Sequence, residues 1–215
     1  MNPPIAKKIR TTFENHGDVR HDDYYWLNEK TNPEVLAHLE AENAYFAEVM
    51  APLNSRTNDI YEAMLARIPN EEIAVPIQRG PYFYYTRQEK DLQYPMYARK
   101  FAASRAALTE AKEEIILDVN ALAAGDDYLS TTDIRPSDDQ RLLAYLENRD
   151  GTDSYTLYIK DLETGTLLDD VIPNVYIYGS VEWSACGHYL FYVTINDQQR
   201  PYQLWRHQIG TALTE

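Results

Sequence analysis

Apolar residues recur at helical spacing in two stretches within the first 70 residues. The first stretch follows Asn32, a residue suited to cap a helix, and Pro33, which fits the first helical position. Its apolar positions share one side of the predicted helix: Val35, Leu36, Leu39, Phe46, Val49 and Met50. A second helix is predicted from Ser55 to Arg67. Its apolar side consists of Ile60, Met64, Leu65 and Ile68. Such stripes are typical of core packing, so we expect both to be buried.

Beyond about residue 71 the pattern changes to short aromatic and β-branched runs that are broken by turn residues, which indicates strands. Three of these runs match one another and form an internal repeat: residues 80–86, 140–146 and 187–193. A second strand begins 17 residues after the start of each run: at Tyr97, Leu157 and Leu204. Tyr85, Tyr145 and Tyr192 occupy the same position in the three copies.

Each pair of strands reads as an antiparallel hairpin, and Asp150-Gly151 is a strong turn signal in the middle copy. A further hairpin is predicted through Asp161 to Gly165. The copies begin 60 and 47 residues apart, close to the roughly 40 to 50 residues of a propeller blade. A β-sandwich can also contain three two-stranded copies, but the matched offset favours blades. We therefore predict a mainly β fold, a partial β-propeller over residues 71–215 with a helical extension over residues 1–70.

The composition adds three points. Tyrosine is abundant, with 18 Tyr against 5 Phe, which suits half-buried sheet positions whose hydroxyls reach water. Cys186 is the single cysteine, so an intrachain disulfide is excluded, and we expect it to be a small buried side chain. The N-terminus has no apolar run of signal-peptide length and no window of the chain approaches a membrane span. A cytoplasmic protein without a membrane partner is the expectation.

The net charge of -14 is concentrated in one region, because residues 110–170 contain 16 acidic and only five basic residues. Phosphate binding requires clustered Lys and Arg, so nucleic acid is not expected as a partner. Two interpretations remain for the acidic region: a solvated surface that aids solubility, or a field that steers cationic peptides into a cleft. The candidate residues for substrate steering or for interdomain ion pairs are Asp126, Asp127, Glu147, Arg149 and Asp153.

No motif in the chain assigns a catalytic, cofactor-binding or metal-ligating residue, and no cofactor is expected. A Gly-x-Ser-x-Gly nucleophile elbow and a phosphate-binding glycine loop are both absent from the sequence. His16 and His21 lie among Asp18, Asp22 and Asp23, but no further ligands follow at a fixed spacing, which argues against a metal site. The acidic pairs Asp126-Asp127 and Asp138-Asp139 fall between predicted strands, where solvated turns are commoner than acid–base dyads.

Two stretches of the chain resemble the prolyl oligopeptidase family of serine peptidases. The first is its N-terminal signature, here His16-Gly17-Asp18-Val19-Arg20-His21-Asp22-Asp23-Tyr24-Tyr25-Trp26-Leu27. The second, residues 201–211, is similar to a segment of the family's propeller. Tyr24-Tyr25-Trp26-Leu27 points to the oligopeptidase B branch, and Tyr25 argues against the proline-specific branch, which usually has Arg there.

The resemblance implies a seven-bladed propeller, of which residues 71–215 would hold the first two to three blades. It also implies that residues 1–70 pack on a C-terminal α/β-hydrolase domain that carries a Ser-Asp-His triad, with Tyr24, Tyr25 and Trp26 as interdomain anchors. This chain is expected to stop before that domain and to be inactive alone. Open blade edges would then favour association with another copy.

The function implied by the resemblance is hydrolysis of short peptides, after Arg or Lys in the oligopeptidase B branch. The propeller would cap the active site and admit short basic peptides while excluding folded proteins. Two alternatives stay open: a non-catalytic β-rich binding module from a truncated or split gene, and a proline-specific oligopeptidase of the same family.

Overall fold

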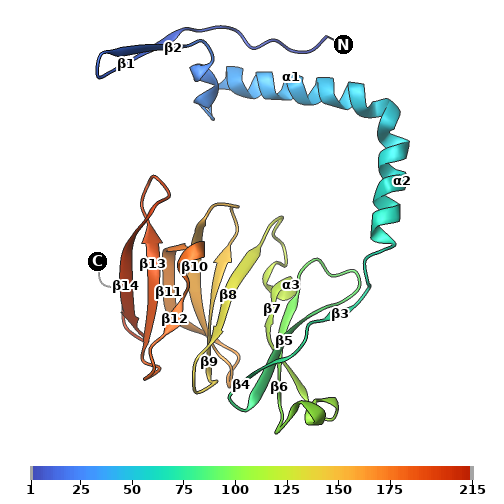
Figure 1. Cartoon of the computed structure of the whole chain (residues 1–215), viewed down its shortest axis with the longest axis vertical. Coiled ribbons are helices and arrows are strands. Elements are labelled where there is room, and N and C mark those ends of the chain that lie inside the picture. The colour runs from blue at the N-terminus through green and yellow to red at the C-terminus, as the bar shows by residue number, and fades with distance from the viewer. Residues whose placement is uncertain (1, 214–215) are drawn as a thin grey trace. The chain divides into compact units, whose positions relative to one another are not determined.

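The computed structural model describes residues 2–213, and the chain divides into two compact units, Met1–Ile68 and Pro69–Glu215. Unit 1 contains a short hairpin followed by helical elements (Figure 1). These elements are β1 (Thr11–Asn15), β2 (Asp18–Asp22), the 3-10 helix η1 (Tyr25–Asn28), α1 (Pro33–Met50), the 3-10 helix η2 (Ala51–Leu53) and α2 (Asn54–Leu65).

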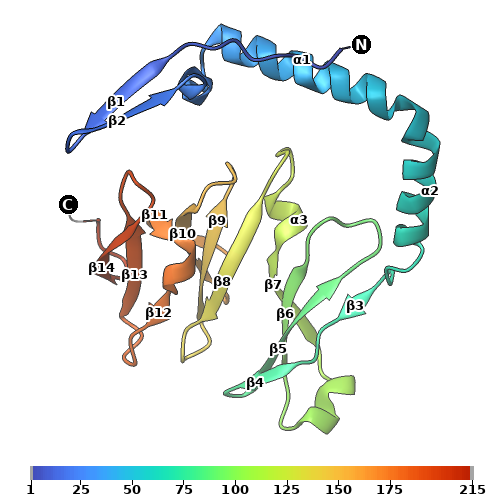
Figure 2. The same ribbon diagram turned by 45° about the horizontal axis from the view of Figure 1, so that its top comes forward.

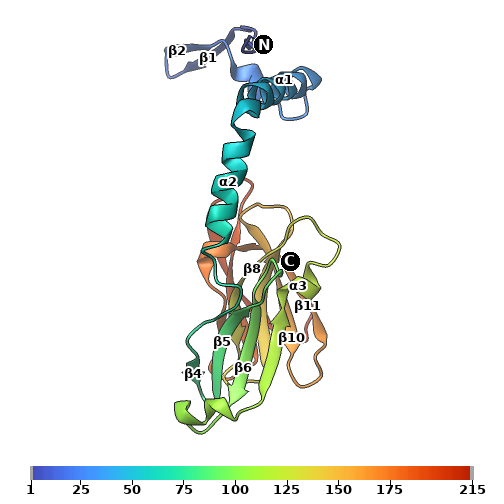
Figure 3. The same cartoon turned by 90° about the vertical axis from the view of Figure 1, so that its right-hand side faces the viewer.

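The start of α1 follows the prediction from the sequence. The side chain of Asn32 accepts a hydrogen bond of 2.9 Å from the backbone N–H of Glu34, and Pro33 occupies the first turn. Pro52 lies in η2, where α1 gives way to α2 and the helical segment changes direction (Figure 3).

The hairpin of β1 and β2 was not predicted. Asn15 pairs with Asp18, so His16 and Gly17 form a two-residue turn. Both residues have positive φ, 52° and 80°, as the tight turns of β-hairpins require. Figure 2 shows this hairpin close to η1 and the start of α1. The family signature at residues 16–27 therefore begins in a turn of a strand pair.

The prediction that both apolar helical stripes are buried is wrong for most of their residues. Val35 is buried, but Leu39 and Val49 are exposed and Phe46 is 63% exposed. On α2, Ile60 is exposed as well. The two helices are consecutive and run in different directions, so neither covers the apolar face of the other within unit 1 (Figure 3). Apolar side chains of both helices therefore remain exposed on the described part of this unit.

Unit 2 consists of two antiparallel sheets, one of five and one of seven strands, and we describe the second as two blades because a single backbone pair joins its halves (Figure 1). Blade 1 contains β3 (Glu72–Ile73), β4 (Ile77–Arg79), β5 (Tyr82–Gln88), β6 (Met96–Phe101) and β7 (Glu113–Asp118). Blade 2 contains β8 (Ser130–Pro136), β9 (Leu142–Asn148), β10 (Ser154–Asp161) and β11 (Leu167–Tyr176). Blade 3 contains β12 (Glu182–Trp183), β13 (Tyr189–Ile195) and β14 (Pro201–Gln208). Short helices lie in the connections: η3 (Arg105–Thr109), α3 (Val119–Leu122) and η4 (Ile177–Gly179).

The internal repeat is confirmed, although its second strands begin one to three residues earlier than predicted, at Met96, Ser154 and Pro201. Its three hairpins are β5–β6, β9–β10 and β13–β14, and the three equivalent tyrosines face the same register position. The pairs are Tyr85 with Ala98, Tyr145 with Tyr158, and Tyr192 with Trp205. All three tyrosines are buried. The predicted hairpin through Asp161 to Gly165 joins β10 to β11. The mainly β, partial propeller fold is thus confirmed.

Blades 2 and 3 meet at a single backbone pair, Val175 of β11 with Thr194 of β13. Most of the contact between blades comes from side chains. One cluster, between blades 1 and 2, has the buried members Ile116, Leu117, Val119, Leu129, Leu143 and Tyr145. The other, between blades 2 and 3, has the buried members Ala144, Leu146, Tyr155, Leu157, Ile159, Ile172, Val175, Val181, Leu190 and Tyr192.

A buried arginine links blades 1 and 2 through polar contacts. Arg99 on β6 donates to both carboxylate oxygens of Glu114, from Nε at 2.7 Å and from Nη2 at 3.0 Å. Its Nη1 donates to the backbone oxygen of Gln140 in blade 2 at 2.6 Å. In the same seam, Nζ of Lys160 donates to the backbone oxygen of Ile116 at 2.9 Å. Each of these cations therefore bridges two blades.

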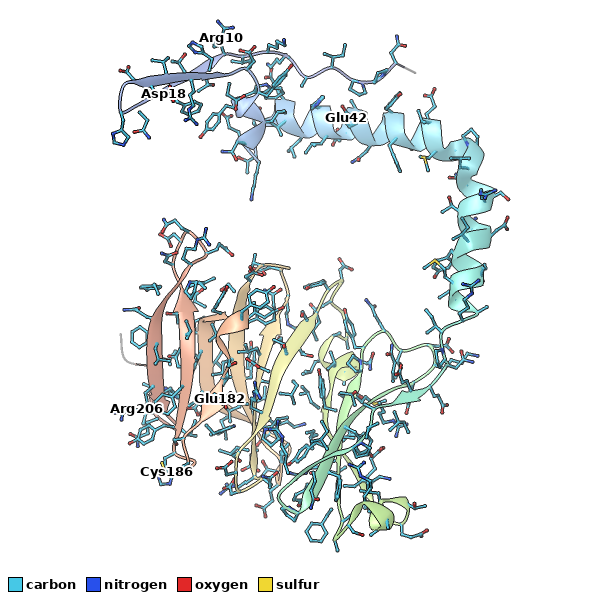
Figure 4. All side chains as sticks on the ribbon, in the orientation of Figure 1. Arg10, Asp18, Glu42, Glu182, Cys186 and Arg206 are labelled. Carbon is cyan, nitrogen blue, oxygen red and sulfur yellow. The ribbon has the colours of Figure 1, made fainter. Side chains whose placement is uncertain are left out.

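The prediction that Cys186 is buried is wrong. This residue lies exposed in the turn between β12 and β13 (Figure 4). The turn places Gly187 at a φ of 73° and directs its residues outside the core. The Cys186 thiol is 3.3 Å from the hydroxyl oxygen of Ser184, and the hydrogen bonds from Ser184 and from the backbone N–H of His188 lower the pKa of the thiol.

Candidate functional site

All five candidate charges lie at one end of blade 2. Ser130 pairs with Asn148 and Ser154 with Tyr176, so the start of β8, the β9–β10 turn and the end of β11 share this end. The β5–β6 turn of blade 1 joins it, because the hydroxyl of Tyr94 accepts from the backbone N–H of Leu129 at 3.1 Å. We call these loops the entry end, because β3, the first strand of unit 2, begins beside the β5–β6 turn. The entry end comprises residues 89–95, 119–129, 148–154 and 177–181.

Three of the candidate residues form a closed network. Arg149 makes ion pairs with Asp126 and with Glu147, the latter at 2.6 Å from Nε, and its Nη2 donates to the backbone oxygen of Leu122 at 3.2 Å. The side chain of Glu147 is only 7% exposed, and this burial raises the pKa of its carboxyl. Asp126, Glu147 and Arg149 are therefore engaged with one another.

Asp127 and Asp153 differ from that network. Both are exposed at the entry end, and neither makes an ion pair with any residue from 2 to 213. Carboxylates without a partner keep their full charge for an approaching cation. Of the five predicted residues, these two are the exposed ones without an ion-pair partner among the described residues.

We predict that Arg149→Met lowers the free energy of unfolding at pH 7 by about 1–3 kcal/mol, because Glu147 then keeps a buried charge without a partner. The folded pKa of Glu147 lies above its unfolded value, so the folded state binds more protons between the two values and stability falls as pH rises through that window. The loss should therefore shrink when the pH is lowered from 7 toward 5. Urea unfolding at both pH values measures it.

The control for this prediction is the double variant Arg149→Met/Glu147→Gln, in which no buried charge is left. It should recover much of the loss at pH 7 and show little change with pH. An equal loss at both pH values in the single variant would contradict the role assigned to Glu147.

The aromatic residues of the family signature divide into two kinds. Trp26 is buried, its Nε1 donates to the backbone oxygen of Lys7 at 2.9 Å, and its ring lies 6.5 Å from that of His38 on α1. Trp26 thus ties the N-terminal segment to the helix inside unit 1. Tyr24 and Tyr25 are nearly half exposed, and Tyr25 packs edge-on against Phe13 of β1 at 4.7 Å. Their service as interdomain anchors remains a prediction.

The other polar clusters have local roles. Nδ1 of His21 lies 3.0 Å from the hydroxyl oxygen of Thr12 across the hairpin, and His16 forms its turn. Asp139 accepts from the hydroxyl of Ser137 and from the backbone N–H of Arg141, and these bonds lower the pKa of its carboxyl. Within residues 2–213, no three His, Cys, Asp or Glu side chains are grouped so as to hold a metal ion.

Neither α1 nor α2, the longest helices that the structure describes, has the length and apolar content that crossing a membrane requires.

Exposed tyrosines at the entry end are a feature that the sequence reasoning missed. Tyr128 precedes β8 and Tyr178 lies in η4, and both are on the surface. The high tyrosine content was the only signal for them.

Comparison with known proteins gives a consistent result. A family model described as "Prolyl oligopeptidase, N-terminal beta-propeller domain" matches residues 3–215. Protease 2 of Moraxella lacunata is 59% identical over 211 residues, which cover 98% of this chain and 31% of that protein. Dipeptidyl aminopeptidase BI of Pseudoxanthomonas mexicana is 40% identical over 203 residues, 89% of this chain and 28% of that protein.

A solved structure, oligopeptidase B from Leishmania major, superimposes with a TM-score of 0.87 at 28% identity, over 98% of this chain and 31% of that one. The chain therefore spans less than a third of the length of the relatives that it matches. The matched third is the N-terminal one that holds propeller blades.

Proposed function

This chain belongs to the prolyl oligopeptidase family, as an N-terminal propeller portion, and from that premise we propose that the intact protein hydrolyses short peptides and prefers Arg or Lys before the scissile bond. The similarity to Protease 2 and to oligopeptidase B supports the class of enzyme. The remaining two thirds of such a protein would supply the catalytic domain and its triad.

The proposed role of unit 2 is to limit the size of substrates. Blades around a closed active site admit oligopeptides and exclude folded proteins, and separation of the domains would open the site. The proposed role of unit 1 is attachment. Its exposed apolar residues, such as Phe46 and Val49, and the half-exposed Tyr24 and Tyr25 suit burial against the catalytic domain.

One observation supports the proposed preference for basic peptides: Asp127 and Asp153 are exposed at the same end of blade 2 and make no ion pair within residues 2–213. Exposed charges act on a substrate over about 8 Å at physiological ionic strength. An approaching Arg or Lys side chain would therefore be attracted by these two carboxylates before it reaches the active site. Asp126 and Glu147 contribute less, because Arg149 neutralises part of their charge.

To test this proposal, Asp127→Asn and Asp153→Asn are combined in the intact peptidase that carries this chain. We expect kcat/KM for a substrate with Arg before the leaving group to fall about two- to fivefold at low salt, and the effect to fade as salt rises. A substrate with a neutral residue at that position should be unaffected at every salt concentration.

Asp138→Asn is the matched control, because Asp138 is also exposed but lies at the opposite end of blade 2, in the β8–β9 turn. It should leave both substrates unchanged. Equal losses for the two substrates, or a loss that does not depend on salt, would contradict steering and would point to disturbed packing.

A further inference from the structure

Four tyrosines gather at the entry end of the seam between blades 2 and 3. We call them the tyrosine patch: Tyr128, Tyr155, Tyr176 and Tyr178. Tyr178 is 72% exposed, and its ring lies edge-on to that of Tyr176 at 5.5 Å. Tyr128, on the other side, is 45% exposed. Large apolar side chains with this exposure are a cost to a soluble protein unless they serve contact.

The buried Tyr155 joins the two sides of the patch. Its hydroxyl donates to the hydroxyl of Ser130 at 3.0 Å, just beyond Tyr128 in the chain. Ser154, the neighbour of Tyr155 in β10, pairs with Tyr176 of β11, so Asp153 lies beside the start of η4, the segment that carries Tyr178. The patch is therefore one surface built from two connections of blade 2, rather than separate exposed rings.

The exposed rings of the patch lack a cation, in contrast to other aromatic rings of the chain. The guanidinium of Arg99 lies 4.2 Å from the ring centre of Tyr82, and that of Arg206 lies 4.8 Å from that of Tyr189. Within the described residues, no Lys or Arg stands over Tyr128 or Tyr178. The ring faces that attract cations are thus free.

The charge beside the patch selects the kind of partner. Asp153 lies two residues before Tyr155 and Asp127 directly precedes Tyr128, and neither carboxylate makes an ion pair within the part of the chain that the structure describes. The nearby cation, Arg149, is already held by Asp126 and Glu147. An aromatic face next to a free carboxylate suits a guanidinium, which is planar, weakly hydrated and able to stack and to donate hydrogen bonds at once.

We propose that the tyrosine patch docks an arginine side chain of a peptide, with the guanidinium against Tyr178 or Tyr128 and hydrogen-bonded to Asp153. The proposal rests on the proposed function, because the peptide would be a substrate on its way to the active site. The proposal goes beyond that function because it names a short-range contact between the guanidinium and an aromatic ring. Electrostatic steering acts at a distance and needs no aromatic ring.

The test measures binding rather than catalysis. The whole chain is labelled with ¹⁵N and titrated with the acetylated and amidated peptide Gly-Arg-Gly-Arg-Gly, and then with the same peptide carrying citrulline in place of arginine. Citrulline keeps the shape and removes the charge. We expect saturable shifts at residues 126–130, 153–155 and 176–180 with the arginine peptide, and at least about fivefold weaker binding of the citrulline peptide.

The variants separate the contribution of the aromatic ring to peptide binding from that of the carboxylate charge. Tyr178→Ala should weaken binding of the arginine peptide about two- to fivefold at both low and high salt, whereas Tyr178→Phe should keep it. Asp153→Asn should weaken binding at low salt and lose its effect at high salt. Tyr202→Ala is the matched control, because Tyr202 is an exposed tyrosine on β14. Thermal unfolding of each variant verifies that the fold is kept.

Equal binding of the two peptides would overturn the proposal. So would equal affinities of Tyr178→Ala, Tyr202→Ala and the parent, because attraction would then come from diffuse charge alone. Failure of the proposal and failure of the proposed function are distinguishable: an intact peptidase without a preference for basic substrates would refute that function, while the binding measured on this chain tests the patch alone.

Discussion

The Arg99→Met variant is expected to unfold with a free energy about 2–4 kcal/mol below that of the parent. Arg99 is almost fully buried in the seam between blades 1 and 2. Its removal leaves the backbone oxygen of Gln140 without its donor and Glu114 without its partner. This loss of unfolding free energy should lie in the lower part of the range for a broken buried ion pair. The reason is that the side chain of Glu114 is 41% exposed, so water can solvate its charge.

Urea unfolding measures the loss, and Arg79→Met is the control. Arg79 is exposed on β4 of the same sheet and makes no ion pair within the described residues, so its replacement should change the free energy of unfolding by less than about 0.5 kcal/mol. A loss below about 1 kcal/mol for Arg99→Met would show that water replaces the bridge and that the apolar cluster alone holds the two blades.

Leu157→Ala should lower the free energy of unfolding by about 2–5 kcal/mol, whereas Leu204→Ala should change it by less than about 0.5 kcal/mol. The two leucines hold equivalent positions in the internal repeat, because Leu157 is the fourth residue of β10 and Leu204 the fourth residue of β14. Leu157 is 0% exposed between blades 2 and 3, and its truncation leaves a cavity there. Leu204 is 73% exposed, because no described element covers that face of blade 3.

Thermal and urea unfolding of the two variants decide this prediction, since the chemical change is identical. Similar losses for both would mean that Leu204 is covered in solution, as association with a second copy of the chain would do. Repeating the measurement over a range of protein concentrations would then reveal the association, because the stability of an assembly rises with concentration.

Leu157 and Leu204 also mark what the sequence can and cannot predict about this fold. The repeat of hairpins was predictable because its cues are local: alternating strands, turn residues such as Asp150-Gly151, and a constant offset. Whether a given position is covered depends on the neighbouring blade, which the local pattern does not contain. The exposed stripe of α1 has the same origin, because helical periodicity identifies an apolar face and not its partner.

Local reasoning also failed at two turns. His16-Gly17 lacks the Asn or Asp that usually signals a hairpin, so the β1–β2 pair was not predicted although both residues adopt positive φ. Cys186 was expected in the core because cysteine is commonly buried, but its neighbour Gly187 turns the chain there. In both cases turn geometry outweighed the residue type.

The position of the candidate site was predictable from the sequence, but which of its charged residues form ion pairs was not. Counting charges identified the acidic loops of blade 2, and all five chosen residues lie in or next to those loops. The sequence gives no sign that Arg149 reaches both Asp126 and Glu147, since the first contact spans 23 residues. Only the folded structure shows that Asp127 and Asp153 make no ion pair among the described residues and that Tyr178 is exposed, because the strands bring their loops together.

The single backbone pair between β11 and β13 has a mechanical consequence. Within a blade, hydrogen bonds at regular intervals make the sheet stiff, so bending is concentrated where those bonds are missing. Between blades 2 and 3 the ties are side chains, such as Trp183 donating to the backbone oxygen of Arg135 at 2.9 Å and His207 to Asp170 at 2.6 Å. Such ties tolerate a small tilt without loss of secondary structure. Elastic strain in the sheet is thus taken up at a hinge line that passes beside Val175.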